Sequence, residues 1–183
     1  TLFMTVLALL LSVPFGVGAA IYLVEYAKKG NKLVGIIRVT AETLSGIPSI
    51  IYGLFGMLFF VTALKWGYSM MAGAATLAIM VLPVIMRTTE EALLCVPDSF
   101  REGSFGLGAG KLRTIFKIVL PSAIPGILSG IILAIGRIVG ETAALIYTSG
   151  TVANLAGFFD SGRTLAVHMY TLSREGMPTN EAY

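Results

Sequence analysis

Two oppositely charged side chains, Arg137 and Glu141, lie inside a long apolar run of the sequence. An ionised side chain at the middle of a bilayer costs at least about 2.5–3.5 kcal/mol on insertion scales, so both should face the interior of a helix bundle. Their spacing along the chain places them on one face of a helix, roughly one turn apart. The pair therefore predicts either a mutual ion pair that stabilises the bundle or a path for an anion.

The anion path follows from the chemistry of the two groups. The planar guanidinium of Arg137 presents several N–H donors that suit the oxygens of phosphate or sulfate. Glu141 would hold this guanidinium in place, or accept a hydrogen bond from a protonated oxyanion, and Thr142 adds a hydroxyl next to it. Two glycine pairs in the same run have the spacing that lets membrane helices pack closely, namely Gly126 with Gly130 and Gly136 with Gly140.

A second group of polar residues occupies positions 87–121, the longest polar stretch between apolar runs. A helical pattern over residues 89–95 is interrupted by Pro97, and a new helix should start near Phe100 with Asp98 or Ser99 as its cap. A further helical run is expected from Leu112 to Leu120, ending at Pro121. Glycines disfavour helix between these runs, and they predict a tight turn or close backbone contact at Gly103, Gly106, Gly108 and Gly110.

The composition predicts the class of protein that carries these groups. The 183 residues are 56% hydrophobic and only 13% charged, whereas soluble domains carry about 25% charged residues. We therefore expect an all-α, polytopic transmembrane helix bundle that forms one domain over residues 1–183. Nucleic-acid binding is disfavoured because no basic stripe alternates with aromatic residues. We expect no metal site and no cofactor, because Cys95 and His168 are each the only residue of their type.

Apolar runs predict four membrane spans. Ser45 is a candidate cap for the second span, with Pro48 near its start, and a short interfacial helix should precede it over residues 32–43. The expected spans cover residues 1–24, 43–64, 69–86 and 123–147.

Basic residues alternate between the connections. They are frequent in residues 25–42 and 87–121, whereas the connection near position 65 contains Lys65 alone and the last segment holds Arg163 and Arg174. Lys and Arg are enriched in cytoplasmic connections. The two basic connections should therefore be cytoplasmic, and the stretch 87–121 either lies on the bilayer or docks on a cytosolic partner.

The stretch 87–121 resembles the EAA loop of bacterial ABC-importer permeases. Glu102-Gly103-Ser104 is followed by Gly108 at the family's offset and then by Ile118, Leu120 and Pro121. This sequence departs from the family at Gly103-Ser104, where two alanines are usual, so the packing stays close but the helix should be weaker. The resemblance implies a type I permease fold whose coupling helix docks on an ATP-binding cassette subunit. The residues expected to couple to the ATPase are Phe100, Glu102, Gly103, Gly108, Leu120 and Pro121.

The charged helix resembles the phosphate-specific permeases, which occur as a PstA and PstC pair. Gly136-Arg137 and Gly140-Glu141-Thr142-Ala143 are similar to both, and the run 140–148 resembles PstA, as do residues 46–55 and 164–170. The family has six membrane helices, so this chain is expected to hold about four to five, with others before Thr1 and after Tyr183. The resemblance also implies that Arg137 and Glu141 line the phosphate path.

These features predict a multi-pass permease subunit of an ATP-driven importer of inorganic phosphate in the inner, cytoplasmic membrane of a prokaryote, surrounded by lipid. Its expected partners are an ATP-binding subunit, a PstC-like second permease and an extracytoplasmic phosphate-binding protein. The chain lacks the Gly-x4-Gly-Lys-Ser/Thr loop of ATPases, so ATP hydrolysis should occur on the partner. The alternative is a permease for sulfate or molybdate. An intramembrane enzyme is disfavoured because the spans contain no His or Asp to act as a base. A purely structural subunit is the remaining alternative.

Overall fold

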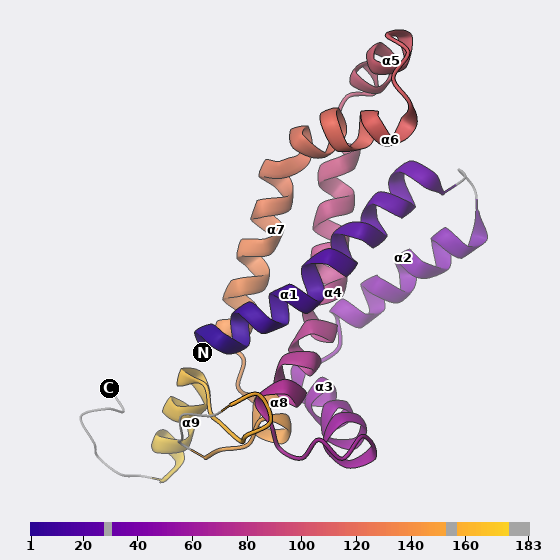
Figure 1. Cartoon of the computed structure of the whole chain (residues 1–183). Helices are drawn as coiled ribbons and strands as arrows, with labels where there is room; N and C mark the ends of the chain where they lie inside the picture. The colour runs from indigo at the N-terminus through magenta and orange to yellow at the C-terminus, as the bar shows by residue number, and fades with distance from the viewer. Residues whose placement is uncertain (28–30, 153–156, 176–183) are drawn as a thin grey trace. The chain divides into compact units, whose positions relative to one another are not determined.

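The computed structural model describes residues 1–27, 31–152 and 157–175, and all their regular secondary structure is helical, as the sequence predicts (Figure 1). The label η marks π-helical segments, in which backbone N–H groups bond five residues back. In chain order the elements are α1 (Leu2–Ile21), η1 (Tyr22–Tyr26), α2 (Lys32–Ser45), α3 (Ser49–Gly56), η2 (Met57–Ala63), α4 (Met70–Leu94), α5 (Asp98–Gly106), α6 (Lys111–Thr114), η3 (Ile115–Val119), α7 (Leu120–Gly140), α8 (Ala143–Thr148) and α9 (Leu165–Glu175).

Three helices in the described residues are long and apolar enough to cross a membrane: Leu2–Tyr26, Met70–Leu94 and Lys111–Gly140. The broken pair of α2 with α3 and η2 would make a fourth. The first predicted span is confirmed. The second is interrupted between Ser45, where α2 ends, and Ser49, where α3 begins. Ser45 does not cap the next helix, and its hydroxyl donates to the Glu42 carbonyl at 2.7 Å. The helix expected over residues 32–43 is present as α2, none of whose residues is buried.

The last two predicted spans have different bounds from those expected. Helix α4 continues through Pro83 to Leu94. The expected stop at Pro121 is wrong, because α6, η3 and α7 follow one another without a break. The π-helical segment η3 ends two residues before this proline and widens the helix next to the position where Pro121 has no N–H to donate. Helix α7 ends at Gly140 rather than near Tyr147, and the short helix α8 follows after two residues.

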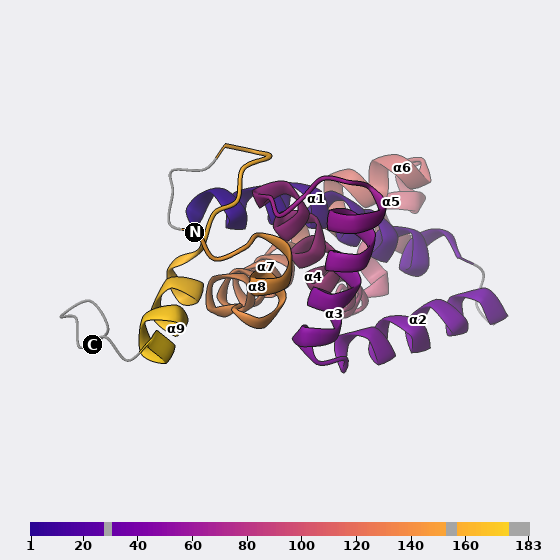
Figure 2. The same ribbon diagram turned by 90° about the horizontal axis from the view of Figure 1, so that it is seen from below.

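The helices form two compact units. Unit 1 comprises Thr1–Ser12, Gly46–Val81 and Ile135–Tyr183, and unit 2 comprises Val13–Ser45 and Leu82–Ala134. Helices α1, α4 and α7 each contribute to both units. In unit 1, α3 packs against α8 (Figure 2). A Cβ atom at Gly53 would lie 2.8 Å from the Cα of Ala144, so this contact requires glycine.

Unit 2 has a core to which α1, η1, α4, η3 and α7 contribute. Its buried members are Ala20, Leu23, Met86, Leu93, Val96, Val119, Ala123 and Ile127. The predicted packing role of the first glycine pair is confirmed, because a Cβ at Gly126 would lie 2.6 Å from that of Ala92, and one at Gly130 would overlap Thr88. In contrast, Cβ atoms at Gly136 and Gly140 would meet nothing within 4 Å.

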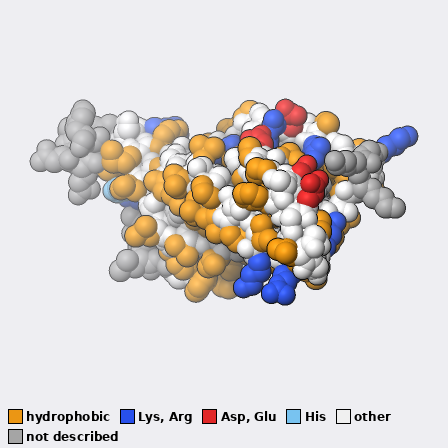
Figure 3. Space-filling view, turned by 90° about the horizontal axis from the view of Figure 1, so that it is seen from above, with side chains coloured by type: hydrophobic (Ala, Val, Ile, Leu, Met, Phe, Trp, Pro, Cys, Tyr) orange, Lys and Arg blue, Asp and Glu red, His pale blue; other side chains and the backbone are white. Residues whose placement is uncertain are grey.

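Many large apolar side chains remain exposed, as in a protein that contacts lipid. They include Leu10 and Phe15 of α1, Ile36 of α2, and Ile132 and Leu133 of α7. Figure 3 shows hydrophobic side chains spread over one face, with the acidic side chains gathered in one part of it and basic side chains beside them and along the edges. Exposed apolar surface of this extent is typical of membrane or protein contacts.

Candidate functional site

The first group of predicted site residues lies at the end of α7. Arg137 is in its last turn and partly buried, whereas Glu141 comes just after the helix and is 9% exposed. The expectation that both lie on one continuous helix is therefore wrong. The mutual ion pair does not form either, since no carboxylate of the described residues lies within ion-pairing distance of Arg137.

Glu141 has a local partner instead. Its Oε1 atom accepts a hydrogen bond from the Ala144 backbone N–H at 3.1 Å, in the first turn of α8. An N–H at a helix start has no partner within its own helix, so a side-chain oxygen there stabilises the helix end. Glu141 therefore caps α8 and stabilises the break between α7 and α8. Sequence reasoning missed this break, although Gly140 indicated a place where a helix ends easily.

Other polar groups of unit 1 lie near this break. Thr142 immediately precedes α8, and its carbonyl accepts a hydrogen bond from Ile146 at 3.1 Å. Tyr52 of α3 is 5% exposed and interacts electrostatically with Arg137. A guanidinium, a phenol and a threonine hydroxyl are groups that bind oxyanions by hydrogen bonds.

The second group, positions 87–121, contains α5 as its central helix. Helix α5 begins at Asp98, close to the expected start, but neither Asp98 nor Ser99 caps it. Pro97 takes the cap position without a side-chain bond, and its carbonyl accepts from the Phe100 N–H at 3.1 Å. The Asp98 carboxylate instead accepts a hydrogen bond from Arg101 at 3.1 Å.

Arg101 is the most extensively bonded side chain of this loop, and its side chain is only 14% exposed. Its guanidinium donates twice to Glu25 Oε1, at 3.0 and 2.8 Å. It also donates to the carbonyls of Leu93 and Val96, at 3.0 and 2.8 Å. Sequence reasoning missed these contacts, because Glu25 is 76 positions away from Arg101.

Of the two roles expected for the glycines of the loop, the structure shows the tight turn, at Gly108. Only Gly108 among them adopts a left-handed conformation, with φ of +80°, and it forms the turn between α5 and α6. A Cβ at Gly103, Gly106, Gly108 or Gly110 would meet nothing within 4 Å, so none of them is needed for close contact within the described chain. The two arms of the turn are instead joined by a buried hydrogen bond of 2.8 Å between the Ser104 and Thr114 hydroxyls.

The outer side of this loop is apolar and open. Phe100, Phe105 and Leu107 are 49%, 47% and 91% exposed. A groove lies beside them, lined by Ser99, Phe100, Gly103, Ser104, Leu107, Lys117, Ile118, Pro121 and Ser122. Of the residues predicted to couple to an ATPase, Glu102 and Gly108 are also exposed, while Leu120 packs against the core of unit 2. The loop therefore presents the predicted residues on its surface, apart from Leu120.

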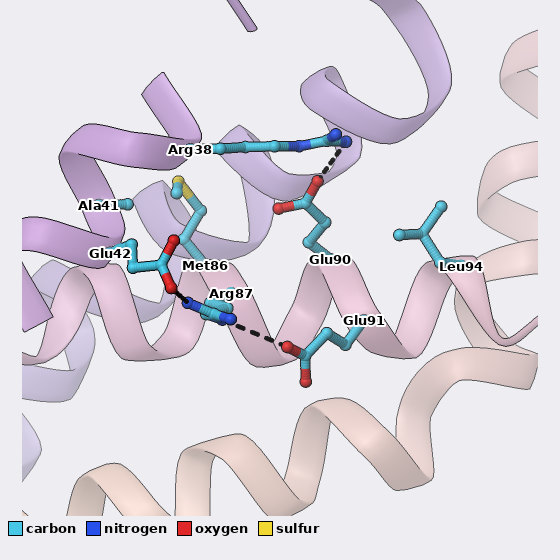
Figure 4. Close-up of a pocket in the computed structure, with 8 residues that line it drawn as sticks. All are labelled: Arg38, Ala41, Glu42, Met86, Arg87, Glu90, Glu91 and Leu94. Carbon is cyan, nitrogen blue, oxygen red and sulfur yellow. Dashed lines mark hydrogen bonds and ion pairs between the residues drawn. The ribbon is translucent and has the colours of Figure 1, made fainter. Parts of the chain in front are cut away.

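A third polar group, which sequence reasoning missed, joins α2 to α4 in unit 2 (Figure 4). Arg38 pairs with Glu90 at 2.5 Å, and Arg87 pairs with Glu42 at 3.2 Å and Glu91 at 3.3 Å. The Glu90 side chain is only 10% exposed, whereas both partners of Arg87 are more than half exposed. Exposed pairs contribute little to stability, so the Arg38–Glu90 pair is the main ionic link between α2 and α4.

Comparison with known proteins supports a transport role. Residues 12–162 match the family described as "Binding-protein-dependent transport system inner membrane component". The chain belongs to this family. It is thus a multi-pass inner-membrane component of an ABC transporter, as the EAA-like loop predicted. Members of this family are permease components rather than catalytic enzymes.

Relatives of this permease component include phosphate permeases. It is 39% identical over 191 residues to the "Probable ABC transporter permease protein YqgI" of Bacillus subtilis, covering 96% of this chain and 65% of that protein. It is 40% identical over 173 residues to the "Phosphate transport system permease protein PstA 1" of Mycobacterium tuberculosis, covering 93% and 56%. The predicted resemblance to PstA is thereby confirmed. The chain spans between about half and two thirds of the length of these relatives.

A solved structure confirms the fold class. The permease component superimposes with a TM-score of 0.74 and 20% sequence identity on a chain from "Inward facing conformations of the MetNI methionine ABC transporter", covering 99% of this chain and 78% of that one. At this identity the similarity concerns the fold alone.

Proposed function

We propose that this chain is the PstA-like permease subunit of an ATP-driven importer of inorganic phosphate. It forms the translocation path with a second, PstC-like permease chain and receives phosphate from an extracytoplasmic binding protein. A separate ATP-binding cassette subunit hydrolyses ATP. The observation that carries the proposal is the 40% identity to a PstA phosphate permease over 93% of the chain.

In this proposal Arg137 is the phosphate-binding residue of the path. Its guanidinium is partly buried and lacks a carboxylate partner among the described residues, so its donors are available to an anion. Thr142 adds a hydroxyl to the path. Glu141 lines the path while it caps α8 through one oxygen, and its other oxygen can accept a hydrogen bond from a monoprotonated phosphate.

Coupling to the ATPase is assigned to α5 and the following turn. The exposed side chains of Phe100, Phe105 and Leu107, with the adjacent groove, support docking into an apolar recess on the ATP-binding subunit. Glu102 lies on the surface of the same helix and can pair with a basic group of that subunit.

Phosphate uptake tests the role of Arg137. The complete transporter would be reconstituted in liposomes and supplied with radiolabelled phosphate. Charge-assisted hydrogen bonds contribute about 1.5–3 kcal/mol, so Arg137→Ala should lower the uptake rate about 10- to 100-fold. Arg137→Lys keeps the charge but loses the planar donors, so its uptake rate should lie between those of the unmodified transporter and Arg137→Ala. The control is Lys65→Ala, which removes an exposed cation from the connection between η2 and α4.

Two outcomes would contradict the proposal. Undiminished uptake by a normally assembled Arg137→Ala complex would remove Arg137 from the path. Sulfate or molybdate that competes with phosphate at equal concentration, and is itself accumulated, would favour the alternative of a permease for another oxyanion.

A further inference from the structure

We infer that motion of the coupling loop, formed by α5, the turn at Gly108 and α6, is transmitted to the π-helical turn η1. Glu25 of η1 and Arg101 of α5 are the positioning residues that connect η1 to this loop. The inference rests on the proposed coupling role of α5. It adds a route from α5, through one ion pair, to the C-terminal end of the candidate membrane span Leu2–Tyr26. The geometry of unit 2 supports it in three ways.

The first support is that the Arg101–Glu25 pair is buried and uses every donor of the guanidinium. The two side chains are 14% and 9% exposed. Arg101 has five N–H donors, and its five hydrogen bonds reach Glu25 of η1, two carbonyls at the end of α4, and Asp98. A guanidinium bonded in this way has a single orientation, so α5 cannot turn relative to η1 without breaking charge-assisted bonds.

The second support is that η1 also contacts the other arm of the loop. The ammonium of Lys111, the first residue of α6, lies 4.9 Å from the ring centroid of Tyr26, a cation–π distance. Two consecutive residues of η1 thus contact α5 and α6. The loop and η1 are thus linked at two points, and the Ser104–Thr114 hydrogen bond joins α5 to α6.

The third support is the structure of η1 itself. The Ala27 N–H donates to the Tyr22 carbonyl, five residues earlier, at 2.9 Å. Single π-helical turns are rare and often occur at functional positions. Leu23 of this turn is 4% exposed and belongs to the core of unit 2 together with Leu93 and Val119. A displacement of η1 is therefore transmitted to packed side chains of the membrane helices.

The test uses the complete transporter in liposomes with three variants. Glu25→Gln keeps the shape of the side chain but removes its charge, and Arg101→Lys keeps the charge but loses the fork of donors. Arg113→Lys is the matched control, because Arg113 is exposed and lies in α6 of the same loop. Three quantities are measured: phosphate accumulated per ATP hydrolysed, ATP-binding subunit retained on purification, and an ATP-dependent signal from α1. For the last, a fluorophore is attached at Phe15→Cys, a 68% exposed position, in a Cys95→Ser background.

We expect Glu25→Gln and Arg101→Lys to retain the ATP-binding subunit within twofold of the unmodified complex. The ratio of phosphate to ATP should fall at least fivefold, and the ATP-dependent fluorescence change should fall at least by half. The Arg113→Lys complex should match the unmodified one.

A ratio and a fluorescence change within twofold of the unmodified complex would overturn the inference. Loss of the ATP-binding subunit in proportion to the loss of transport would also overturn it, because the pair would then serve assembly alone. An unmodified complex that moves no phosphate would instead refute the proposed function. The fluorescence measurement, which needs only ATP, would still decide the role of the ion pair.

Discussion

The close approach of α7 to α4 at Gly130 leads to a quantitative prediction. A Cβ atom at Gly130 would overlap the Thr88 hydroxyl and lie 2.7 Å from the Thr88 Cβ. Rotation about χ1 of Thr88 would move its hydroxyl and methyl groups but not its Cβ atom, and the hydroxyl donates to the carbonyls of Val84 and Ile85 at 3.0 and 3.2 Å. The substitution Gly130→Ala therefore requires the two helix backbones to separate.

The expected cost follows from comparison with a second position on the same helix. Gly136→Ala adds the same methyl group where nothing lies within 4 Å. Both changes replace glycine by alanine in helix α7, so their effects on helix propensity largely cancel when the two variants are compared. The difference is then the cost of overpacking, about 1–3 kcal/mol. We expect Gly130→Ala to be the less stable variant by this amount.

The free energy of unfolding in mixed detergent micelles, followed by circular dichroism, would measure this difference. Gly130→Ala should unfold at a lower denaturing-detergent fraction than Gly136→Ala. Gly136→Ala should be at least as stable as the unmodified protein, because alanine favours helix over glycine and its methyl group meets nothing within 4 Å. Equal stability of the two variants would show that α7 and α4 do not approach closely at Thr88, and the described packing of unit 2 would be refuted.

Two further predictions concern the polar contacts. Glu141→Ala should destabilise the protein by about 1 kcal/mol, because the Ala144 N–H loses its acceptor. Glu141→Gln keeps an oxygen that can accept this hydrogen bond, so it should retain stability. Equal midpoints of thermal unfolding for the two variants would exclude the cap. Arg38→Ala should destabilise by about 1 kcal/mol, because Glu90 is buried while Arg38 is half exposed and screened by solvent. Adding Glu90→Gln should restore most of this loss in a double-mutant cycle, and additive losses would contradict the pairing.

Local sequence patterns were sufficient to predict that the chain is helical and that the polar stretch 87–121 separates two of its apolar runs. The first membrane helix, the helix starting near Phe100 and the turn at Gly108 all depend on residues within a few positions of each other. Such features follow from hydrophobic periodicity and from the conformational preferences of glycine and proline. The predicted helix bounds were less accurate where a helix continues through a proline. At Pro121 the π-helical segment η3 precedes the residue that has no N–H, and the helix does not end there.

The sequence by itself thus determined the membrane class, the helical architecture and the exposed loop with its family motif. Only the tertiary structure decided which partners the charged groups have: Arg101 pairs with the distant Glu25, while Arg137 and the nearby Glu141 do not pair. It also decided that Gly130 is at a helix contact and Gly136 is not. The physical reason is that periodicity assigns a residue to a face of its own helix, whereas a buried charge or a close contact depends on which other segment the fold brings to that face.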